Sequence, residues 1–551
     1  MIKEMDMKNL NNIRKIGITV VVFLTIMVSS CTQLKDESFN TIVANKFTAT
    51  DSDLSALAGS AYVNWRIVLN DWNGLYRANE VSGDEMLTPA RPNGWVDGGV
   101  YRRIHEHKWT TDDDIVVNTW SRTYAGITNC NRVIYQVESG AIPVPEADKA
   151  ALVSEMKILR ASYYWVLCDF FGNVPIVDKF DVPEGFLPKQ NTRKEVYDFI
   201  IKEVTENISK VSAEKNTKTY GKFNQWAAHA LLAKVYLNAG VYAGTPAWDK
   251  CITECDAILN SGVGYGLESN QKDVFVTNNE GSKEIIFALP FDSKYVTNWN
   301  AFDIHMQTLQ PENQATYNLE STPWGGVCAV PQYINTFDTD DSRYKDNYIK
   351  GQQYKANGDI IYCTLGEYKG QPLAYINELP GVDISEEVHG FRLGKFEIAM
   401  GATNRLSNDF PLFRYADILL MKAECLLRQG KADEAAAIVT QVRARNFKST
   451  PAKATVTGAD LQKGSVYDYG LRNHITSTKE GGADIQYGRF LDELGYEFCQ
   501  EGRRRTDMVR FGMFTKKSWL SHSPNGDYRV LFPIPLGEIQ KNANLKQNPG
   551  Y

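Results

Sequence analysis

Apolar residues recur every three or four positions along several stretches of the first half of the chain. This spacing is typical of amphipathic helices, in which one face is buried. The stretches that show it most clearly are Ile115–Gln136, Lys149–Phe171, Arg193–Val211, Asn224–Asn238 and Trp248–Asn260. They come in pairs. Gly240 follows the fourth stretch as a C-terminal cap, so the fourth and fifth stretches are expected to form a helical hairpin.

The same spacing returns near the C-terminus. Phe413–Gln429 carries an apolar stripe, Gly430 ends it, and Ala432–Asn446 supplies the partner helix. Small residues at Ala423, Ala435 and Ala436 let the two helices approach closely. These hairpins are similar to tetratricopeptide hairpins, but their irregular spacing does not predict a regular solenoid. We therefore expect them to form a scaffold.

Helical periodicity fades between residues 261 and 409. Gly, Asn, Asp, Thr and aromatic residues dominate this stretch, and only short extended runs such as Glu284–Leu289 stand out. Glu80–Thr111 has a similar composition. Long loop-rich segments inside a large protein are usually functional, so these two regions are the expected location of a binding site.

Both loop regions combine aromatic residues with amide and charged side chains. An aromatic ring stacks on the C–H face of a sugar, while amides and charged groups hold its hydroxyls. Trp95 is the strongest candidate, because it follows Asn93-Gly94 in a polar loop where a core role is hard to arrange. The alternative, that these aromatic residues fill the core, stays open. The candidate ligand-binding residues are Trp95, Trp324, Trp299, Tyr295, Asn93, Arg91 and Asp84.

Paired carboxylates raise the alternative of a glycoside hydrolase, which needs two acidic groups flanking the bond. The pairs present are Asp84-Glu85, Asp112 to Asp114, Asp340-Asp341 and Glu386-Glu387. Adjacent residues do not by themselves give the required separation, and such clusters usually cap helices or face solvent. Nucleophile-elbow, phosphate-loop and zinc-protease motifs are absent from the sequence. We therefore expect no catalytic residues.

Composition and cysteine usage further limit which kinds of partner and cofactor are expected. The chain has 551 residues, 43% of them hydrophobic, and a net charge of −6 without a basic stripe, so a large core is expected and nucleic acid is not. His105 and His107 share a face but have no third ligand in view, so neither a metal nor another cofactor is expected. Buried free thiols are the expectation for most of the cysteines after Cys31, which are Cys130, Cys168, Cys251, Cys255, Cys328, Cys363, Cys425 and Cys499.

The N-terminus has the pattern of a lipoprotein signal. Lys8, Arg14 and Lys15 precede the uncharged run Ile16–Ser30, which is shorter than a membrane-spanning helix and ends on small residues before Cys31. We expect residues 1–30 to be removed and Cys31 to carry the lipid. Residues 31–45 then form a tether, and 46–551 a single domain, with a helical scaffold mainly in 46–260 and 410–551 and a loop-rich insert at about 261–409.

A set of motif-like segments stands in order along nearly the whole mature chain. It consists of Glu155–Trp165 with Phe171–Pro175, Ala228–Tyr236, Val330–Arg343, Arg414–Glu424, Glu497–Arg505 with Arg510-Phe511, Phe532–Pro535 and Asn548–Tyr551. Together these segments resemble the RagB/SusD family of Bacteroidetes outer-membrane nutrient-uptake lipoproteins, and the ordered set is more specific than any one segment. Lys35-Asp36-Glu37 also resembles the surface-export signal of such lipoproteins.

This resemblance implies a mostly α-helical, SusD-like fold, with tetratricopeptide-like hairpins packed against an irregular ligand-binding part. It implies a non-catalytic lipoprotein at the outer surface of the outer membrane. Such a protein captures oligosaccharide for a SusC-like TonB-dependent transporter. The starch-binding member of the family presents an aromatic arc, to which Trp95 and Trp324 correspond. Peptide capture by the same architecture and, less favoured, a surface hydrolase remain the alternatives.

Overall fold

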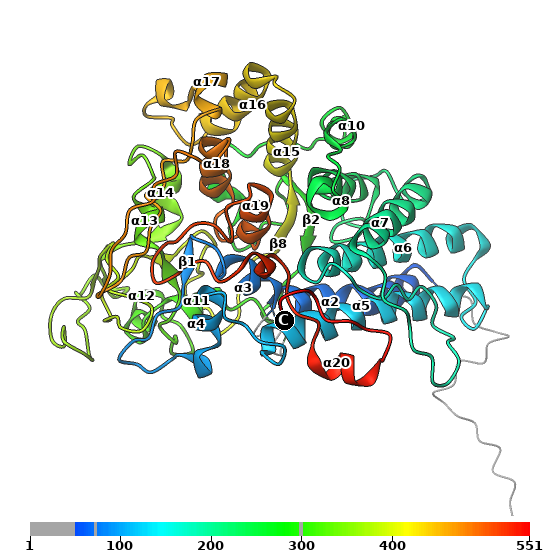
Figure 1. Ribbon diagram of the computed structural model, residues 1–551, viewed down its shortest axis with the longest axis horizontal. Coiled ribbons are helices and arrows are strands. Elements are labelled where there is room, and N and C mark those ends of the chain that lie inside the picture. Colours follow the sequence, from blue (N-terminus) through cyan, green and yellow to red (C-terminus); the bar gives the residue numbers. More distant parts are fainter. Residues whose placement is uncertain (1–49, 71–73, 297–300) are drawn as a thin grey trace, which may run out of the picture. The chain divides into compact units, whose positions relative to one another are not determined.

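The computed structural model describes residues 50–70, 74–296 and 301–551, and most of its regular structure is helical, as predicted (Figure 1). These residues lie within one compact unit, Ala49–Tyr551. Cys31 and residues 35–37 lie outside the described residues, so the division into signal peptide, tether and single domain stays a prediction. The helices predicted from apolar spacing are present as α5 (Asp114–Glu138), α6 (Glu146–Phe170), α7 (Arg193–Asn207), α8 (Gln225–Leu237), α10 (Trp248–Leu259), α15 (Tyr415–Arg428) and α16 (Ala432–Ala444).

The first helices pack in sequence order. A further long helix, α2 (Asp51–Asn70), packs against α5, α5 against α6 and α6 against α7. The close approach of α5 and α6 depends on Gly126, since a Cβ atom there would lie 2.5 Å from Cζ of Tyr163. A capping box between Thr192 and Glu195 fixes the start of α7.

The second group of helices is built from two hairpins that are distant in sequence. α10 packs against both α8 and α15, and α15 packs against α16, so the hairpins lie side by side (Figure 1). Gly430, with φ of +82°, ends α15 as predicted. The predicted stop at Gly240 is wrong. Asn238 caps α8, and the chain continues through α9 (Ala239–Ala243) to Gly244, where φ is +77°.

A two-stranded antiparallel sheet joins these hairpins. β2 (Ile285–Leu289) follows α10 and is entirely buried, and it pairs with β8 (Phe410–Arg414), which leads directly into α15. The chain between them is the greater part of the loop-rich insert, residues 261–409. Because β2 and β8 pair, the insert leaves and re-enters the scaffold at one place.

The insert and the remaining connections contain only short elements. Its strands pair antiparallel, β4 (Tyr348–Ile349) with β7 (Arg392–Leu393) and β5 (Gly351–Gln352) with β6 (Ala374–Tyr375), while β1 (Met86–Leu87) pairs with β3 (Cys328–Ala329). The short helices are α3 (Leu75–Glu80), α4 (Val100–His105), α11 (Ile304–Thr308), α12 (Gln314–Tyr317), α13 (Pro331–Ile334), α14 (Ser342–Asp346), α17 (Gly458–Leu461), α18 (Gly488–Phe498), α19 (Arg504–Arg510) and α20 (Leu536–Lys541).

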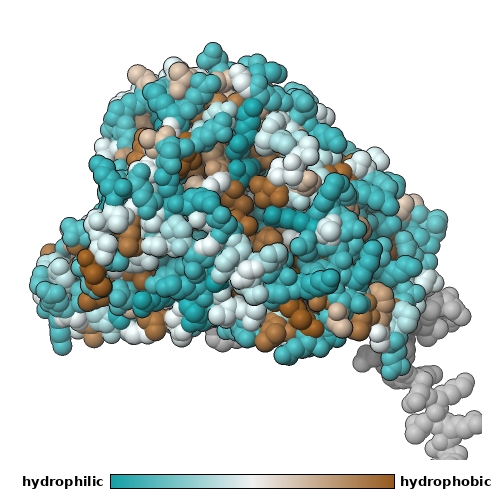
Figure 2. All heavy atoms as spheres, in the orientation of Figure 1, coloured by the Kyte–Doolittle hydropathy of each residue, from teal (hydrophilic) through white to brown (hydrophobic). Residues whose placement is uncertain are grey.

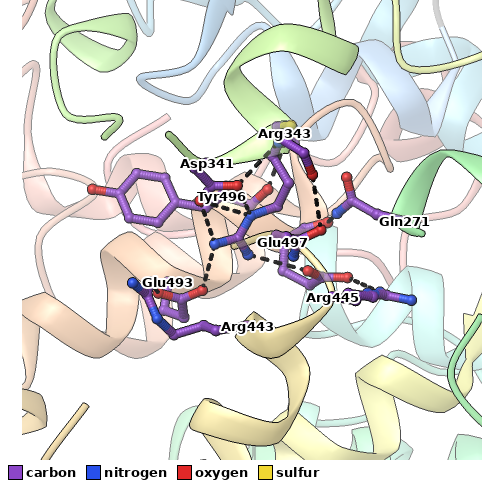
Figure 3. Close-up of polar contacts among 12 residues, drawn as sticks. Gln271, Asp341, Arg343, Arg443, Arg445, Glu493, Tyr496 and Glu497 are labelled. Atoms are coloured by element: carbon purple, nitrogen blue, oxygen red, sulfur yellow. Dashed lines mark hydrogen bonds and ion pairs between the residues drawn. The ribbon is translucent and has the colours of Figure 1, made fainter. Parts of the chain in front are cut away.

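Buried ion pairs hold the insert to the scaffold. Figure 3 shows Arg343 of the insert with Asp341 on one side and Glu493 and Glu497 of α18 on the other, at 2.7, 2.9 and 3.1 Å. We call the whole cluster the ion-pair seam. Its five most buried basic members are matched in number by its acidic members: Arg343, Lys395, Arg414, Arg443 and Arg445 against Glu284, Asp341, Glu493, Glu497 and Glu501. Arg489 lies beside this cluster, 3.5 Å from Glu493.

The cysteines and the molecular surface are the remaining features of the fold. All eight cysteines in the described part of the chain are buried free thiols, as predicted. Within the described ranges, none of the helices combines the length and apolar character needed to cross a bilayer. The face shown in Figure 2 is mostly hydrophilic, with apolar residues gathered in a few patches, one of them at the lower edge near α20.

Candidate functional site

The two loop regions marked by the sequence meet in the structure. Strands β1 and β3 pair, which sets the loop of residues 88–99 against the loop of residues 320–327. The side-chain amide of Asn93 then bridges the two loops, donating to the carbonyl oxygens of Trp324 at 2.6 Å and Gly325 at 3.1 Å. Its own oxygen accepts from the backbone N–H of Trp95 at 3.3 Å. Asn93 therefore positions both loops.

These loops bring Trp95 and Trp324 together. The ring centroids are 5.9 Å apart with an interplanar angle of 41°, and both side chains are half-buried. The ring of Tyr101, which is buried, lies behind that of Trp95, with 5.6 Å between the ring centroids. We call the Trp95–Trp324 pair the aromatic face. The structure thus places the two most favoured sequence candidates side by side and leaves part of each ring open to solvent.

A glycine fixes the position of Trp95. A Cβ atom on Gly326 would lie 2.0 Å from two atoms of the indole, so the ring rests directly on the backbone. Any side chain at this position would have to displace the ring. Gly326 is therefore part of the site although it has no side chain.

Charged groups lie beneath the rings. The guanidinium of Arg77, on α3, is 4.5 Å from the centroid of Tyr101 and 5.9 Å from that of Trp95, which is a cation–π arrangement. Its two terminal nitrogens are buried and have no hydrogen-bond partner among the described residues. Burial raises the pKa of nearby Asp303 to about 6, although Arg77 and the hydrogen bond from Gln307 act in the opposite direction.

The structure corrects the role expected for Arg91. This side chain is 5% exposed, and its guanidinium donates to the carbonyl oxygens of Gly326 and Glu386 and to the sulfur of Cys328. Burial lowers its pKa to about 9. Because its nitrogens already have partners inside the protein, Arg91 anchors the loop rather than facing a ligand.

Asp84 is also corrected. It is fully buried, forms an ion pair with Nε of Arg504 at 2.7 Å, and accepts a hydrogen bond from the hydroxyl of Tyr469 at 2.6 Å. A carboxylate with these partners and no exposed surface cannot reach a ligand, so its assignment as a ligand-binding residue is wrong. It holds the start of the loop to α19.

Of the last two candidates, only Tyr295 lies among the described residues, and it is apart from the aromatic face. Tyr295 is 73% exposed, in a turn whose backbone bonds Asp292, and the ammonium of Lys294 lies 5.0 Å from its ring centroid. Within the described ranges no ring contact links it to Trp95 or Trp324. Trp299 lies outside the described residues, so its role stays a prediction.

Arg77 and Gly326 were not among the sequence candidates. Arg77 lies in Leu75–Glu80, a stretch that is buried at every position and has no apolar stripe to mark its inner face. A glycine between Gly325 and Val327 carries no signal of an aromatic ring that is distant in sequence. Both residues are recognisable only once the two loops are placed together.

The other constellations considered in the sequence have structural roles. Arg103 pairs with Asp113 and Arg343 with Asp341, while Glu386 and Glu387 accept backbone N–H bonds from residues 364–367. His105 and His107 lie with His522 in a buried ring cluster, and burial lowers the pKa of His107 to about 3. No group of three or more potential metal ligands occurs in the part of the chain that the structure describes.

Two sequence-family models match this chain. The model of the SusD family matches residues 377–551, and a SusD-like model described as starch-binding and associating with the outer membrane matches residues 88–237. The starch-binding protein SusD of Bacteroides thetaiotaomicron is 26% identical over 87% of this chain and 86% of its own length. SusD-like protein P25 of Formosa agariphila is 22% identical over 97% of this chain and 99% of its own length.

Solved structures agree with these matches. A laminarin-binding SusD-like protein has a TM-score of 0.69 at 20% identity, covering 92% of this chain and 100% of its own. Surface glycan-binding protein A of Bacteroides thetaiotaomicron, in complex with laminarihexaose, has a TM-score of 0.67 at 18% identity, covering 91% and 100%. The predicted SusD-like fold is confirmed. The chain belongs to the SusD/RagB family of non-catalytic glycan-binding proteins.

Proposed function

We propose that the aromatic face binds an oligosaccharide, and that the protein captures glycan without cleaving it and passes it to a SusC-like TonB-dependent transporter. One observation carries this proposal: two tryptophans from loops distant in sequence are held 5.9 Å apart and half-exposed. Each half-exposed ring leaves apolar surface in contact with water, which a protein would normally bury in its core.

The chemistry around the rings suits a neutral sugar. The tilt of 41° between the rings gives a curved apolar surface against which the C–H faces of successive sugar units can stack. Asp97, two residues after Trp95, is partly exposed. A carboxylate of this kind is a suitable acceptor for a sugar hydroxyl. The face therefore offers both stacking and polar contacts.

The relatives indicate which glycans should be tested first. One relative is named for starch binding, and one similar structure holds laminarihexaose. Starch and laminarin are both glucose polymers with different linkages. We infer that a glucan is the first substrate class to test.

Location at the membrane is part of the same proposal. A family model that matches the chain describes association with the outer membrane. Lipid attachment at Cys31 and export to the cell surface through Lys35-Asp36-Glu37 would place the aromatic face beside the transporter. Labelling of the wild type but not of Cys31→Ala with a radioactive fatty acid tests the anchor; equal labelling of both would contradict it.

The binding proposal is tested by isothermal titration and affinity electrophoresis. The panel holds soluble starch, laminarin and other neutral polysaccharides, with peptides as a second class. We expect Trp95→Ala to weaken glycan binding by at least about tenfold, because stacking on one ring is lost. Phe186→Ala is the control, since Phe186 is an aromatic residue that is 45% exposed and lies in another loop, residues 178–190.

Three outcomes distinguish glycan binding at the aromatic face from the alternatives. Glycan binding that Trp95→Ala reduces and Phe186→Ala leaves unchanged supports the proposal. Binding of peptides without any glycan would select the peptide-capture alternative. Glycan binding that is equal in both variants would mean that the aromatic face is not the site.

A further inference from the structure

A small sheet in the insert presents a row of exposed apolar side chains. Residues 351–375 run as three short antiparallel segments, with Tyr354 opposite Ile360 and Tyr362 opposite Pro372. Side chains alternate along a strand, so Tyr354, Ile360 and Tyr362 share one face. They are 48%, 39% and 51% exposed, whereas the intervening Ile361 is buried. We call these three residues the tyrosine row.

The sheet that carries the row is fixed at both ends. The backbone N–H of Ala356 donates to the carbonyl oxygen of Ala315 at 2.9 Å. At the other end, the N–H groups of Thr364 and Leu365 donate to one carboxylate oxygen of Glu387 at 2.9 and 3.1 Å. The row is therefore a pre-formed surface, and a ligand would not have to order it on binding.

A hollow of about 570 Å³ lies beside the row. Its lining combines the ring of Tyr362 with an ammonium and two carboxylates, and consists of Glu312, Lys355, Asp359, Ile360, Ile361 and Tyr362. One carboxylate oxygen of Glu312 accepts from the hydroxyl of Thr364, and the other is buried without a hydrogen-bond partner among the described residues. The carboxylate of Asp359, whose side chain is 64% exposed, is the one that a ligand hydroxyl can reach.

The sheet also touches the loop that carries the aromatic face. A Cβ atom on Gly366, at the turn of the sheet, would lie 2.8 Å from Cγ of Pro92, so the two segments are in contact. Pro92 precedes Asn93, which positions Trp95 and Trp324. Leu365, next to Gly366, is 39% exposed. The sheet that carries the tyrosine row therefore lies next to the loop of residues 88–99.

We propose that the tyrosine row and the adjoining hollow form a second glycan-contacting surface, which takes a further stretch of a chain already held at the aromatic face. The ring of Tyr362 stacks on a sugar unit, and the exposed carboxylate of Asp359 accepts its hydroxyls. This inference rests on the proposed function. It adds a substrate class: long polysaccharide chains, bound more tightly than short oligosaccharides of the same linkage.

The test compares polymers with trisaccharides on the intact mature protein. The probes are soluble starch with maltotriose, and laminarin with laminaritriose, measured by isothermal titration. The double variant Tyr354→Ala/Tyr362→Ala is expected to bind the polymer about tenfold more weakly and the trisaccharide as the wild type does. Trp95→Ala is expected to weaken both. The control is Tyr135→Ala/Phe186→Ala, whose side chains are 40% and 45% exposed and lie outside residues 351–375.

The outcomes separate the two proposals. Polymer binding equal to wild type in the tyrosine double variant, together with a loss in Trp95→Ala, overturns the second surface and leaves the proposed function intact. A wild-type protein that binds no polymer overturns the proposed function itself. As an independent readout, saturating polymer should slow amide hydrogen exchange in residues 353–363, whereas the trisaccharide should not. Equal exchange under both conditions would contradict the second surface.

Discussion

The ion-pair seam and the aromatic face are both assembled from residues distant in sequence, but they treat polar groups in opposite ways. In the seam, each basic side chain has an acidic partner within 3.1 Å. At the aromatic face, the terminal nitrogens of Arg77 and one oxygen of Asp97 have no hydrogen-bond partner among the described residues, and two tryptophans stay half-exposed. The seam pairs its charges within the protein, although Nε of Arg445 and one oxygen of Glu493 lack a hydrogen bond among the described residues. At the face, the polar atoms without a hydrogen bond lie near half-exposed rings instead.

The pKa values of two carboxyl groups express the same difference. Burial opposes ionisation of Glu493 in the seam, but Arg443, Arg343 and Arg489 outweigh it and lower its pKa to about 2. Near the face, burial dominates for Asp303, and its pKa rises to about 6. The comparison teaches that similar side chains stabilise the fold when their partners are complete and lower its stability when they are not.

The largest expected effect comes from opening the seam. Glu497→Gln removes the charge that Arg343, Arg414 and Arg445 share. Loss of one partner from a buried ion pair costs about 3–5 kcal/mol of unfolding free energy, because the remaining charges stay buried. Urea unfolding followed by circular dichroism measures this change.

Glu538→Gln is the matched control, since Glu538 forms an exposed pair with Lys541, at 34% and 73% exposure. An exposed pair contributes less than about 1 kcal/mol. If the two variants unfold at the same urea concentration, the seam does not stabilise the fold as described.

The next largest effect is a fall in glycan affinity without a comparable change in the unfolding free energy. Gly326→Ala places a methyl group 2.0 Å from the Trp95 indole, so the ring must leave its position. We expect glycan affinity to fall by about tenfold while the unfolding free energy changes by less than about 2 kcal/mol. Titration calorimetry and urea unfolding of the same preparation check both values.

Gly59→Ala controls for the added methyl group, because nothing lies within 4 Å of a Cβ atom there. It should bind glycan like the wild type. Unchanged binding in Gly326→Ala would show that the position of Trp95 is not critical.

The smallest effect concerns pH. The pKa of Asp303 is raised from 3.8 to about 6, so the folded state binds this proton more tightly than the unfolded state. Its contribution to stability is therefore present at low pH and is lost as pH rises through about 6. Asp303→Asn, which cannot ionise, should gain unfolding free energy relative to wild type as pH rises from about 4 to about 8. Unfolding curves at the two pH values measure the gain.

Glu493 should show the opposite sign. Its pKa is lowered from 4.5 to about 2, so its contribution is present above about pH 4.5 and lost as pH falls toward 2. A wild-type protein whose stability is constant between about pH 2 and pH 4.5 would contradict the charge balance of the seam.

Much of the helical scaffold was predictable because its signal is local. The apolar spacing in Arg193–Asn207 and the glycine after Arg428 act within a few residues, and the structure has both a helix and its end there. The stop at Gly240 failed because a glycine allows a helix end without requiring one. Asn238 caps α8, and a further short helix follows it.

The candidate site was predictable in its aromatic part only. Trp95 and Trp324 could be singled out because each lies in a polar loop, yet nothing local distinguished Asp84 and Arg91 from exposed charges. Their burial depends on Arg504 and on Cys328, which are distant in sequence. Charged residues in loops are ambiguous until their partners are known.

The sequence by itself determined the helical class, the family resemblance and the two loops that carry the candidate site, because helix periodicity, caps and motif order are properties of neighbouring residues. Tertiary structure alone decided which of those residues face solvent. The pairing of β1 with β3 joins Trp95 to Trp324, and the bonds of Arg91 and Asp84 are completed inside the protein. Whether a ring stays half-exposed or a charge is bonded inside the protein depends on which residues folding places beside it.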